Sequence, residues 1–250
     1  MNETLARIYD SLEASAAGGV DPARLEQETS SLRRGDGGAT ACPFDEPFGS
    51  IRLVVAPVRL EPDTLAVVLG AREEALQCCS ATVPLSAVFQ TPTSQFHVTL
   101  WHFGRPGDHR PLDGAAVSAE RAALSNTVLA TSPPFELVID KLLLSDSGVL
   151  LLLYQTPDDA PLKMREQLRG AFPASPAKQT VILHSSLARL LGVPSAGEVV
   201  AMREVCSAAT AALRGRTLTI SSVFYVVEKA LPIDGDLSEL PLLGGPGVPT

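Results

Sequence analysis

The chain has 250 residues, 45% of them hydrophobic and 19% charged, which is enough apolar material for a sizeable core and excludes a disordered chain. Lys and Arg number 20 against 28 Asp and Glu, so the net charge is −8, and the field of the whole molecule repels phosphate backbones and anionic lipid. These values argue against an extended nucleic-acid surface but allow a small phosphate-bearing ligand in one local pocket.

The first 49 residues are predicted to form two amphipathic helices and a linker. Apolar residues follow helical spacing over residues 1–16 and again over residues 22–32. Residues 33–49 have the Gly- and Pro-rich composition that is typical of a loop. Because we assign no chemistry to this segment, we expect a chain without residues 1–40 to keep a folded, active core.

The sequence carries no signal for export or for a membrane span. Its start holds Glu3, Asp10 and Glu13 without an apolar run, unlike a secretory signal or an acid-poor transit peptide. The longest apolar stretch, residues 137–154, is interrupted by charges and falls short of a membrane helix. We therefore expect a cytoplasmic protein without membrane contact, with an organelle as the alternative. The four cysteines are expected to be reduced thiols that bind no metal: Cys42, Cys78, Cys79 and Cys206.

Residues 50–230 are predicted to form the main domain, in which strand and helix patterns are mixed. A short turn at residues 145–148 joins two strands so closely that they must be antiparallel, and we expect an α+β fold with largely antiparallel sheets. No glycine-rich dinucleotide or P-loop motif follows any strand. Residues 231–250 are expected to be a disordered tail, since Gly and Pro dominate the end. Strands are predicted at 51–60, 83–90, 96–103, 135–144, 149–155, 181–190 and 218–228, and helices at 115–130, 161–172 and 196–214.

Two of the four histidines occur in the same local pattern on predicted strands. His97 is followed by Thr99 in the sequence HVTL, and His184 is followed by Ser186 in the sequence HSSL. Because side chains alternate along a strand, each histidine shares a face with its hydroxyl. Two such patterns among four histidines arise by chance in under about 1% of sequences of ordinary composition. We interpret them as parts of one site, although periodicity alone does not bring the two strands together.

The two motifs resemble those of the 2H phosphoesterase superfamily, which is named for a pair of HxTx or HxSx motifs. The similarity covers residues 50–229. It implies two pseudo-symmetric lobes whose motif strands face each other across a central cleft, and the order of predicted elements divides the lobes after the helix at 115–130. It also implies that His97 and His184 are catalytic.

Hydrolysis of a cyclic phosphodiester explains why these residue types occur together. One proton leaves the attacking water and another reaches the leaving oxygen on the opposite side of phosphorus, and imidazole serves either role at neutral pH. The hydroxyls of Thr99 and Ser186 would donate hydrogen bonds to phosphate oxygens, whose charge grows in the transition state. We expect no cofactor and no metal, and either histidine could be the base.

Trp101 and Tyr225 are weaker candidates for stacking on a nucleobase. Trp101 falls on the His97 face of its predicted strand, and Tyr225 lies on the last predicted strand. Packing in the core is the alternative for both side chains. His102 falls on the face opposite His97, and His109 lies in a loop, so we expect neither to take part in catalysis.

The resemblance implies a metal-independent phosphodiesterase that hydrolyses 2′,3′-cyclic phosphates of nucleotides or RNA ends. We expect it to act as a monomer on a small substrate, because the acidic surface disfavours a long nucleic acid. One alternative is a non-catalytic module that binds a nucleotide or an RNA end. Another is an RNA-end ligase or exonuclease of the same family, in which the same four residues would serve.

Overall fold

The computed structural model describes residues 2–35 and 38–243. Helices and strands are mixed along this part of the chain. The helices are α1 (Glu3–Ala16), α2 (Pro22–Thr29), α3 (Pro62–Cys78), α4 (Gly114–Thr127), α5 (Ala160–Ala171) and α6 (Ala196–Leu213). The strands are β1 (Leu32–Gly35), β2 (Gly38–Ala41), β3 (Arg52–Pro57), β4 (Val88–Gln90), β5 (His97–Gly104), β6 (Phe135–Leu144), β7 (Val149–Gln155), β8 (His184–Leu190), β9 (Thr217–Ile220), β10 (Ser222–Ala230) and β11 (Asp234–Pro241).

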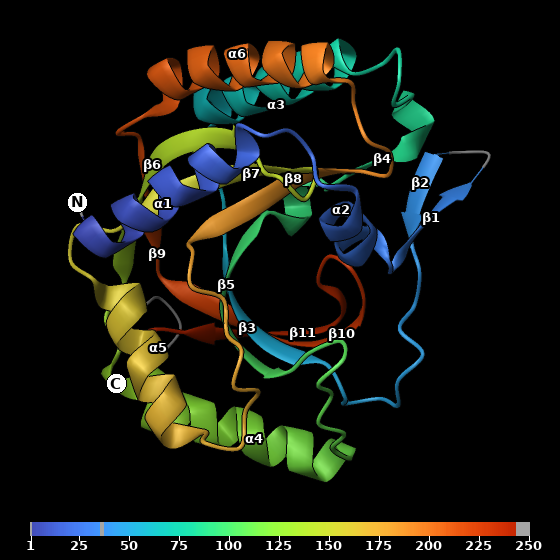
Figure 1. Ribbon diagram of the computed structural model, residues 1–250. Coiled ribbons are helices and arrows are strands. Elements are labelled where there is room, and N and C mark those ends of the chain that lie inside the picture. The colour runs from blue at the N-terminus through green and yellow to red at the C-terminus, as the bar shows by residue number, and fades with distance from the viewer. Residues whose placement is uncertain (1, 36–37, 244–250) are drawn as a thin grey trace.

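Two larger sheets face each other, with helices on their outer sides (Figure 1). One sheet has the strand order β4-β8-β7-β6-β9 and is covered by α3 and α6, and the other has the order β11-β10-β3-β5 and lies beside α4 and α5. Every pairing between the named strands is antiparallel. This arrangement confirms the predicted α+β fold of two antiparallel lobes.

Local sequence signals account for several element boundaries. Ser195 caps α6 by accepting the N–H of Glu198, whose carboxylate in turn accepts the N–H of Ser195 at 2.7 Å. Gly215 follows the helix with a φ of +85°, a conformation that glycine adopts without steric cost. Strands β6 and β7 occupy the predicted ranges, and Gly148 has a φ of +75° in the turn between them.

Helix α3 and strand β11 were not predicted, and neither were β1 and β2, which pair mostly within the segment predicted to be a loop. The apolar side chains of α3 do not gather on one stripe, so no helical periodicity marks it in the sequence. Strand β11 pairs with β10 along most of its length, and the expectation of a tail from residue 231 is wrong for residues 234–241. That strand is mostly polar and gains its structure from pairing rather than from a local pattern. Residues 244–250 lie outside the described residues.

The two lobes interleave along the chain, so the division predicted after the helix at 115–130 is wrong. β3 and β10 come from opposite ends of the main domain, yet they pair side by side. β4 and β5 are neighbours in sequence but belong to different sheets. Strand partners are chosen by hydrogen bonds between distant segments, which the periodicity of one segment does not specify.

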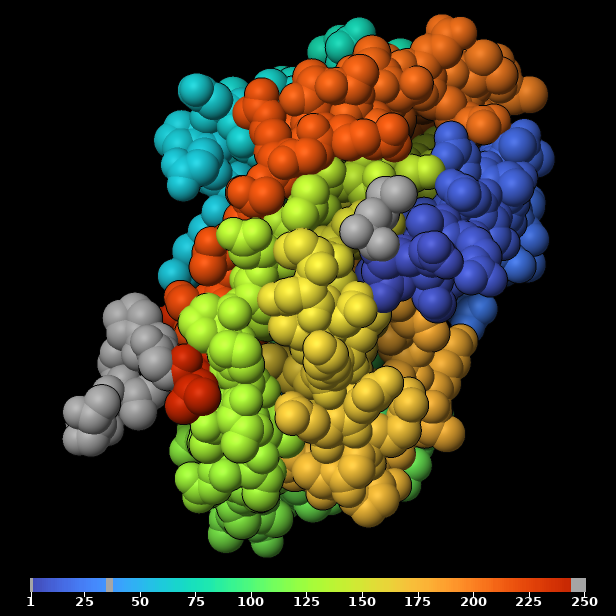
Figure 2. All heavy atoms as spheres, turned by 90° about the vertical axis from the view of Figure 1, so that its left-hand side faces the viewer, coloured from blue at the N-terminus to red at the C-terminus, as the bar shows by residue number. Residues whose placement is uncertain are grey.

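The amino-terminal helix packs into the same core as the main domain. Tyr9 on α1 is fully buried, and its hydroxyl donates to the carbonyl of Tyr154 at 2.6 Å and accepts the N–H of Leu183 at 3.2 Å. Figure 2 shows the blue amino-terminal segment seated against α6 and the yellow α5 region. No helix within residues 2–35 and 38–243 has the length and apolar character needed to cross a membrane.

Candidate active site

One cleft, with a volume of about 640 Å³, is lined by both motif strands. β5 contributes His97 and Thr99, and β8 contributes His184 and Ser186, all four half-buried. Between the last two, the buried Ser185 hydroxyl donates to the carbonyl of His97 at 2.9 Å. This bond joins the strands where the motifs begin, so the structure brings the four predicted residues together.

A β-bulge in β5 turns a third imidazole into the cleft. Thr99 lies opposite Val55 and Trp101 lies opposite Val54, so the intervening Leu100 has no partner on β3. The extra residue reverses the alternation of faces from this point on. His102 therefore lines the cleft, and the expectation that it faces away from His97 is wrong.

Strand β8 carries a bulge at the matching place. Ser186 lies opposite Leu151 and Ala188 lies opposite Leu150, which leaves Leu187 without a partner on β7. Arg189 consequently lines the cleft. Each motif thus supplies a histidine, a hydroxyl two residues later and a further basic side chain five residues later. Sequence reasoning missed that third position because strict alternation assigns it to the buried face.

Neither predicted stacking residue lines the cleft. Trp101 is 2% exposed, and its indole N–H donates to the hydroxyl of Ser175 at 3.0 Å. Tyr225 is 1% exposed, and its hydroxyl donates to the carboxylate of Glu120 at 2.7 Å. The prediction of stacking is wrong for both, and both pack in the core. His109 is exposed in its loop, as expected.

The hydrogen bond of His97 determines which nitrogen is free to take a proton. Its Nδ1 lies 2.8 Å from the carbonyl oxygen of Gln95. Because a carbonyl only accepts, Nδ1 carries the hydrogen, and Nε2 of the neutral ring is the acceptor. Burial lowers the pKa of His97 to about 4; the bond to Gln95 opposes this shift and the charge of Arg189 adds to it.

Burial has the same effect on His184. Burial first, and then the charge of Arg189 and repulsion by a protonated His97, together lower the pKa of this imidazole to about 3. Nδ1 of His184 is buried and makes no hydrogen bond within the described residues. The carbonyl two residues earlier, that of Ile182, instead accepts from Arg165 at 2.9 Å. Both motif histidines are therefore neutral near pH 7 in the free cleft.

Arg189 places a positive charge beside the hydroxyl of the second motif. Its guanidinium lies 2.9 Å from the carboxylate of Glu28 on α2 and 3.4 Å from the hydroxyl of Ser186. An anion that reaches Ser186 therefore meets a charged donor there, and charge-assisted hydrogen bonds are the strong ones.

Arg165 on α5 ties the segments that carry the two motifs. Its side chain is buried and donates to the carbonyls of Thr99 at 2.9 Å and Leu100 at 3.2 Å on β5. It also donates to Ile182 at 2.9 Å and Val181 at 3.3 Å, just before β8. These bonds hold the first motif at a set distance from the second.

The remaining walls of the cleft come from β10 and from the amino-terminal segment. Glu228 on β10 is 8% exposed, and burial raises the pKa of its carboxyl to about 7. Within the described part of the chain, no three His, Cys, Asp or Glu side chains gather as a metal site would require. The amino-terminal segment, to which we assigned no chemistry, forms part of the cleft wall. Ten of its residues line the cleft: Gln27, Glu28, Ser30, Ser31, Arg33, Cys42, Pro43, Phe44, Asp45 and Glu46.

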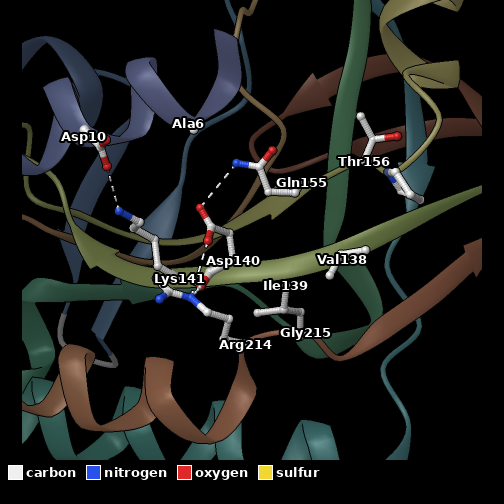
Figure 3. A pocket seen from close by; sticks show the side chains of 11 residues that line it. Ala6, Asp10, Val138, Ile139, Asp140, Lys141, Gln155, Thr156, Arg214 and Gly215 are labelled. Atoms are coloured by element: carbon white, nitrogen blue, oxygen red, sulfur yellow. Dashed lines mark hydrogen bonds and ion pairs between the residues drawn. The ribbon is translucent and has the colours of Figure 1, made fainter. Parts of the chain in front are cut away.

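A second cavity, of about 580 Å³, lies between α1, β6 and the turn before β9 (Figure 3). Its charged side chains pair with one another: Lys141 lies 3.4 Å from Asp10, and Arg214 lies 3.5 Å from Asp140. No histidine lines it. The proton-transfer groups are therefore concentrated in the cleft between the motifs.

Solved structures share this fold. A conserved protein of unknown function from Agrobacterium tumefaciens aligns with a TM-score of 0.55 at 17% identity, over 77% of this chain and 86% of the other. TT0787 of Thermus thermophilus aligns with a TM-score of 0.51 at 14% identity, over 77% and 97%. Usb1 of Kluyveromyces marxianus, solved with uridine monophosphate, aligns with a TM-score of 0.51 at 12% identity, over 78% and 99%.

These likenesses, at 12–17% identity, show that the chain shares the fold of these proteins, with mixed helices and antiparallel sheets. No protein-family model and no curated protein matches the sequence.

Proposed function

We propose that the protein is a metal-independent phosphodiesterase that opens 2′,3′-cyclic phosphates of nucleotides or RNA ends. The observation that carries this proposal is the convergence of two histidines and two hydroxyls, from two bulged strands, in one cleft. The solved structure of Usb1 with uridine monophosphate, a protein of the same fold, supports a nucleotide as ligand.

In this mechanism the cyclic phosphate lies between the two imidazoles. His97 accepts a proton from water through Nε2, since its Nδ1–H is held by Gln95. The water oxygen bonds to phosphorus as the bond to one ribose oxygen breaks, and protonated His184 gives its proton to that oxygen. Thr99, Ser186 and Arg189 would stabilise the charge on the other phosphate oxygens.

The test is turnover of a 2′,3′-cyclic nucleotide by wild type, His97→Ala and His184→Ala, with and without EDTA. We expect each variant to lose roughly 10²- to 10⁴-fold in kcat, the usual contribution of acid or base catalysis. Ser186→Ala should lose up to about 10²- to 10³-fold. Loss of wild-type activity in EDTA, restored by a divalent metal, would contradict the mechanism.

A substrate whose leaving group needs no proton distinguishes the role of His184 as acid from the role of His97 as base. With a p-nitrophenyl phosphodiester, His184→Ala should keep most of the wild-type rate, while His97→Ala should still be slow. Equal losses in both variants would reject this assignment.

The same four residues would also serve an RNA-end exonuclease or ligase, and a binding module would keep the cleft without turnover. Identification of the product from a cyclic nucleotide and from a short RNA separates these alternatives. We favour a small substrate because residues of α2 and of the linker wall one side of the cleft.

A further inference from the structure

The amino-terminal segment reaches the cleft through two short stretches. One is the end of α2 and the residues that follow it, and the other is residues 42–46, which come after the β1-β2 hairpin. The N–H of Cys42 donates to the carbonyl of Ser31 at 2.8 Å, which joins the two stretches. They therefore form one connected wall.

Phe44 is fixed in that wall by backbone pairing with the end of β10. Its N–H donates to the carbonyl of Lys229 at 2.7 Å, and Pro43 forms an antiparallel bridge with Ala230. Residues 43 and 44 thus add to β10 beyond the point where β3 begins at Arg52, which lies opposite Val227. The ring of Phe44 is carried by backbone that the sheet holds in place.

Phe44 is also the single phenylalanine, tyrosine or tryptophan among the described residues that line the cleft. Its side chain is half-buried, so part of the ring remains accessible. Nearby walls are polar and charged, with Arg33 and Glu228 among them. An aromatic face at the margin of a polar cleft suits a flat partner, because every base offers a π-face to an aromatic ring.

We infer that Phe44 stacks on the nucleobase of the substrate, so that the amino-terminal segment supplies the base subsite of the cleft. The inference rests on the proposed function for the kind of ligand, a nucleotide. The charged phosphate lies at the motif residues, and the base extends toward the wall formed by residues 42–46. The protein then distinguishes a nucleotide from a sugar phosphate without base-specific hydrogen bonds.

The experiment compares binding of adenosine 3′-monophosphate with that of methyl riboside 3-phosphate, which has the same sugar and phosphate but no base. Both are titrated by calorimetry into full-length wild type, Phe44→Leu and Phe48→Leu. Phe48 is the matched control, because it is 52% exposed, lies four residues further on and does not line the cleft. Phe44→Trp tests whether another aromatic ring suffices.

Wild type should bind the nucleotide about 5- to 100-fold more tightly than the base-free phosphate, the range for one stacked base. Phe44→Leu should remove most of that preference and keep the affinity for the base-free phosphate, which shows that the cleft is still folded. Phe48→Leu and Phe44→Trp should keep the preference. An unchanged preference in Phe44→Leu would overturn the inference.

The readout separates this inference from the proposed function. If Phe44→Leu loses the preference but wild type never opens a cyclic phosphate, the base subsite stands and the phosphodiesterase proposal fails. If wild type opens cyclic phosphates and Phe44→Leu keeps the preference, the phosphodiesterase proposal stands and the base subsite fails.

Discussion

At the scale of single residues, burial sets the protonation of the cleft. Both motif imidazoles have a pKa well below the ordinary value for histidine, at about 4 for His97 and about 3 for His184. The mechanism needs one of them to carry a proton. A bound phosphate anion supplies the opposite charge that favours an imidazolium, so substrate binding and protonation are coupled.

This coupling predicts the pH dependence of kcat/KM, which reports the free enzyme. His184 is the acid of the proposed mechanism, and above its pKa of about 3 the fraction of this imidazole that carries a proton falls about tenfold per pH unit, because burial disfavours the charged ring. We therefore expect kcat/KM to decline across pH 5 to 8, with the optimum of kcat at higher pH. Initial rates at several substrate concentrations measure both quantities.

Arg189 provides an internal check on that profile, because its charge lowers the pKa of both motif histidines. Arg189→Gln should move the descending limb of kcat/KM to higher pH, whatever it does to substrate affinity. A rising limb of kcat/KM between pH 5 and 7 in wild type would contradict the assignment.

Burial of Glu228 predicts a pH dependence of the stability of the fold. Burial raises the pKa of its carboxyl to about 7, above the ordinary value of 4.5, so the folded state holds the extra proton between these values. The free energy of unfolding is therefore highest below pH 4.5, where this carboxyl is protonated in both states. It falls as the pH rises through 7, because the buried carboxyl must then become charged in the folded state. Glu228→Gln should therefore gain Tm relative to wild type between pH 5 and pH 8.

Thermal unfolding at the two pH values measures that difference. Glu136→Gln is the control, since Glu136 is exposed on β6. A Tm difference between Glu228→Gln and wild type that stays constant with pH would show that the carboxyl does not titrate in this range.

At the scale of elements, the two motif strands β5 and β8 must be held in a set relative position for the site to form. Arg165 donates hydrogen bonds to carbonyls beside both motifs. Arg165→Met should destabilise the fold by on the order of 3 kcal/mol, because buried carbonyls lose a charged donor. The value of kcat should fall as well, since a small misplacement of the reacting groups lowers the rate of the chemical step.

Denaturant unfolding measures this cost, and Arg169→Met is its matched control. Arg169 lies one turn further along α5 and is exposed. Its guanidinium lies 6.0 Å from the centroid of the Trp101 ring on β5, but unlike Arg165 it donates no hydrogen bond to the backbone carbonyls beside the motifs within the described residues. Equal stability and activity of the two variants would show that Arg165 does not position the motifs.

At the scale of the whole molecule, the amino-terminal segment is part of the core and of the cleft. Contrary to the expectation from sequence, we predict that removing residues 1–40 sharply lowers Tm and activity, because it removes buried Tyr9 and the part of the cleft wall that α2 and the residues after it form. Tyr9→Phe isolates the core contribution and should cost about 1–3 kcal/mol, since the Tyr154 carbonyl and Leu183 N–H lose their partner. A truncated chain with wild-type Tm would contradict this.

The sequence by itself determined the local features of this protein. Apolar runs on either side of the turn at residues 145–148 identified β6 and β7 to the residue, and alternation placed each motif histidine on one face with its hydroxyl. These features depend on neighbours within a few positions, and a period of two is visible in the chain. The repeated HxTx-like pattern also pointed to the correct fold.

Only the tertiary structure decided which segments meet and where alternation breaks. The bulges at Leu100 and Leu187 bring His102 and Arg189 into the cleft and bury Trp101. The polar strand β11 and the cleft wall formed by residues 42–46 likewise depend on pairing with β10. Hydrogen bonds between segments distant in sequence produce these features, and no periodicity within one segment encodes them.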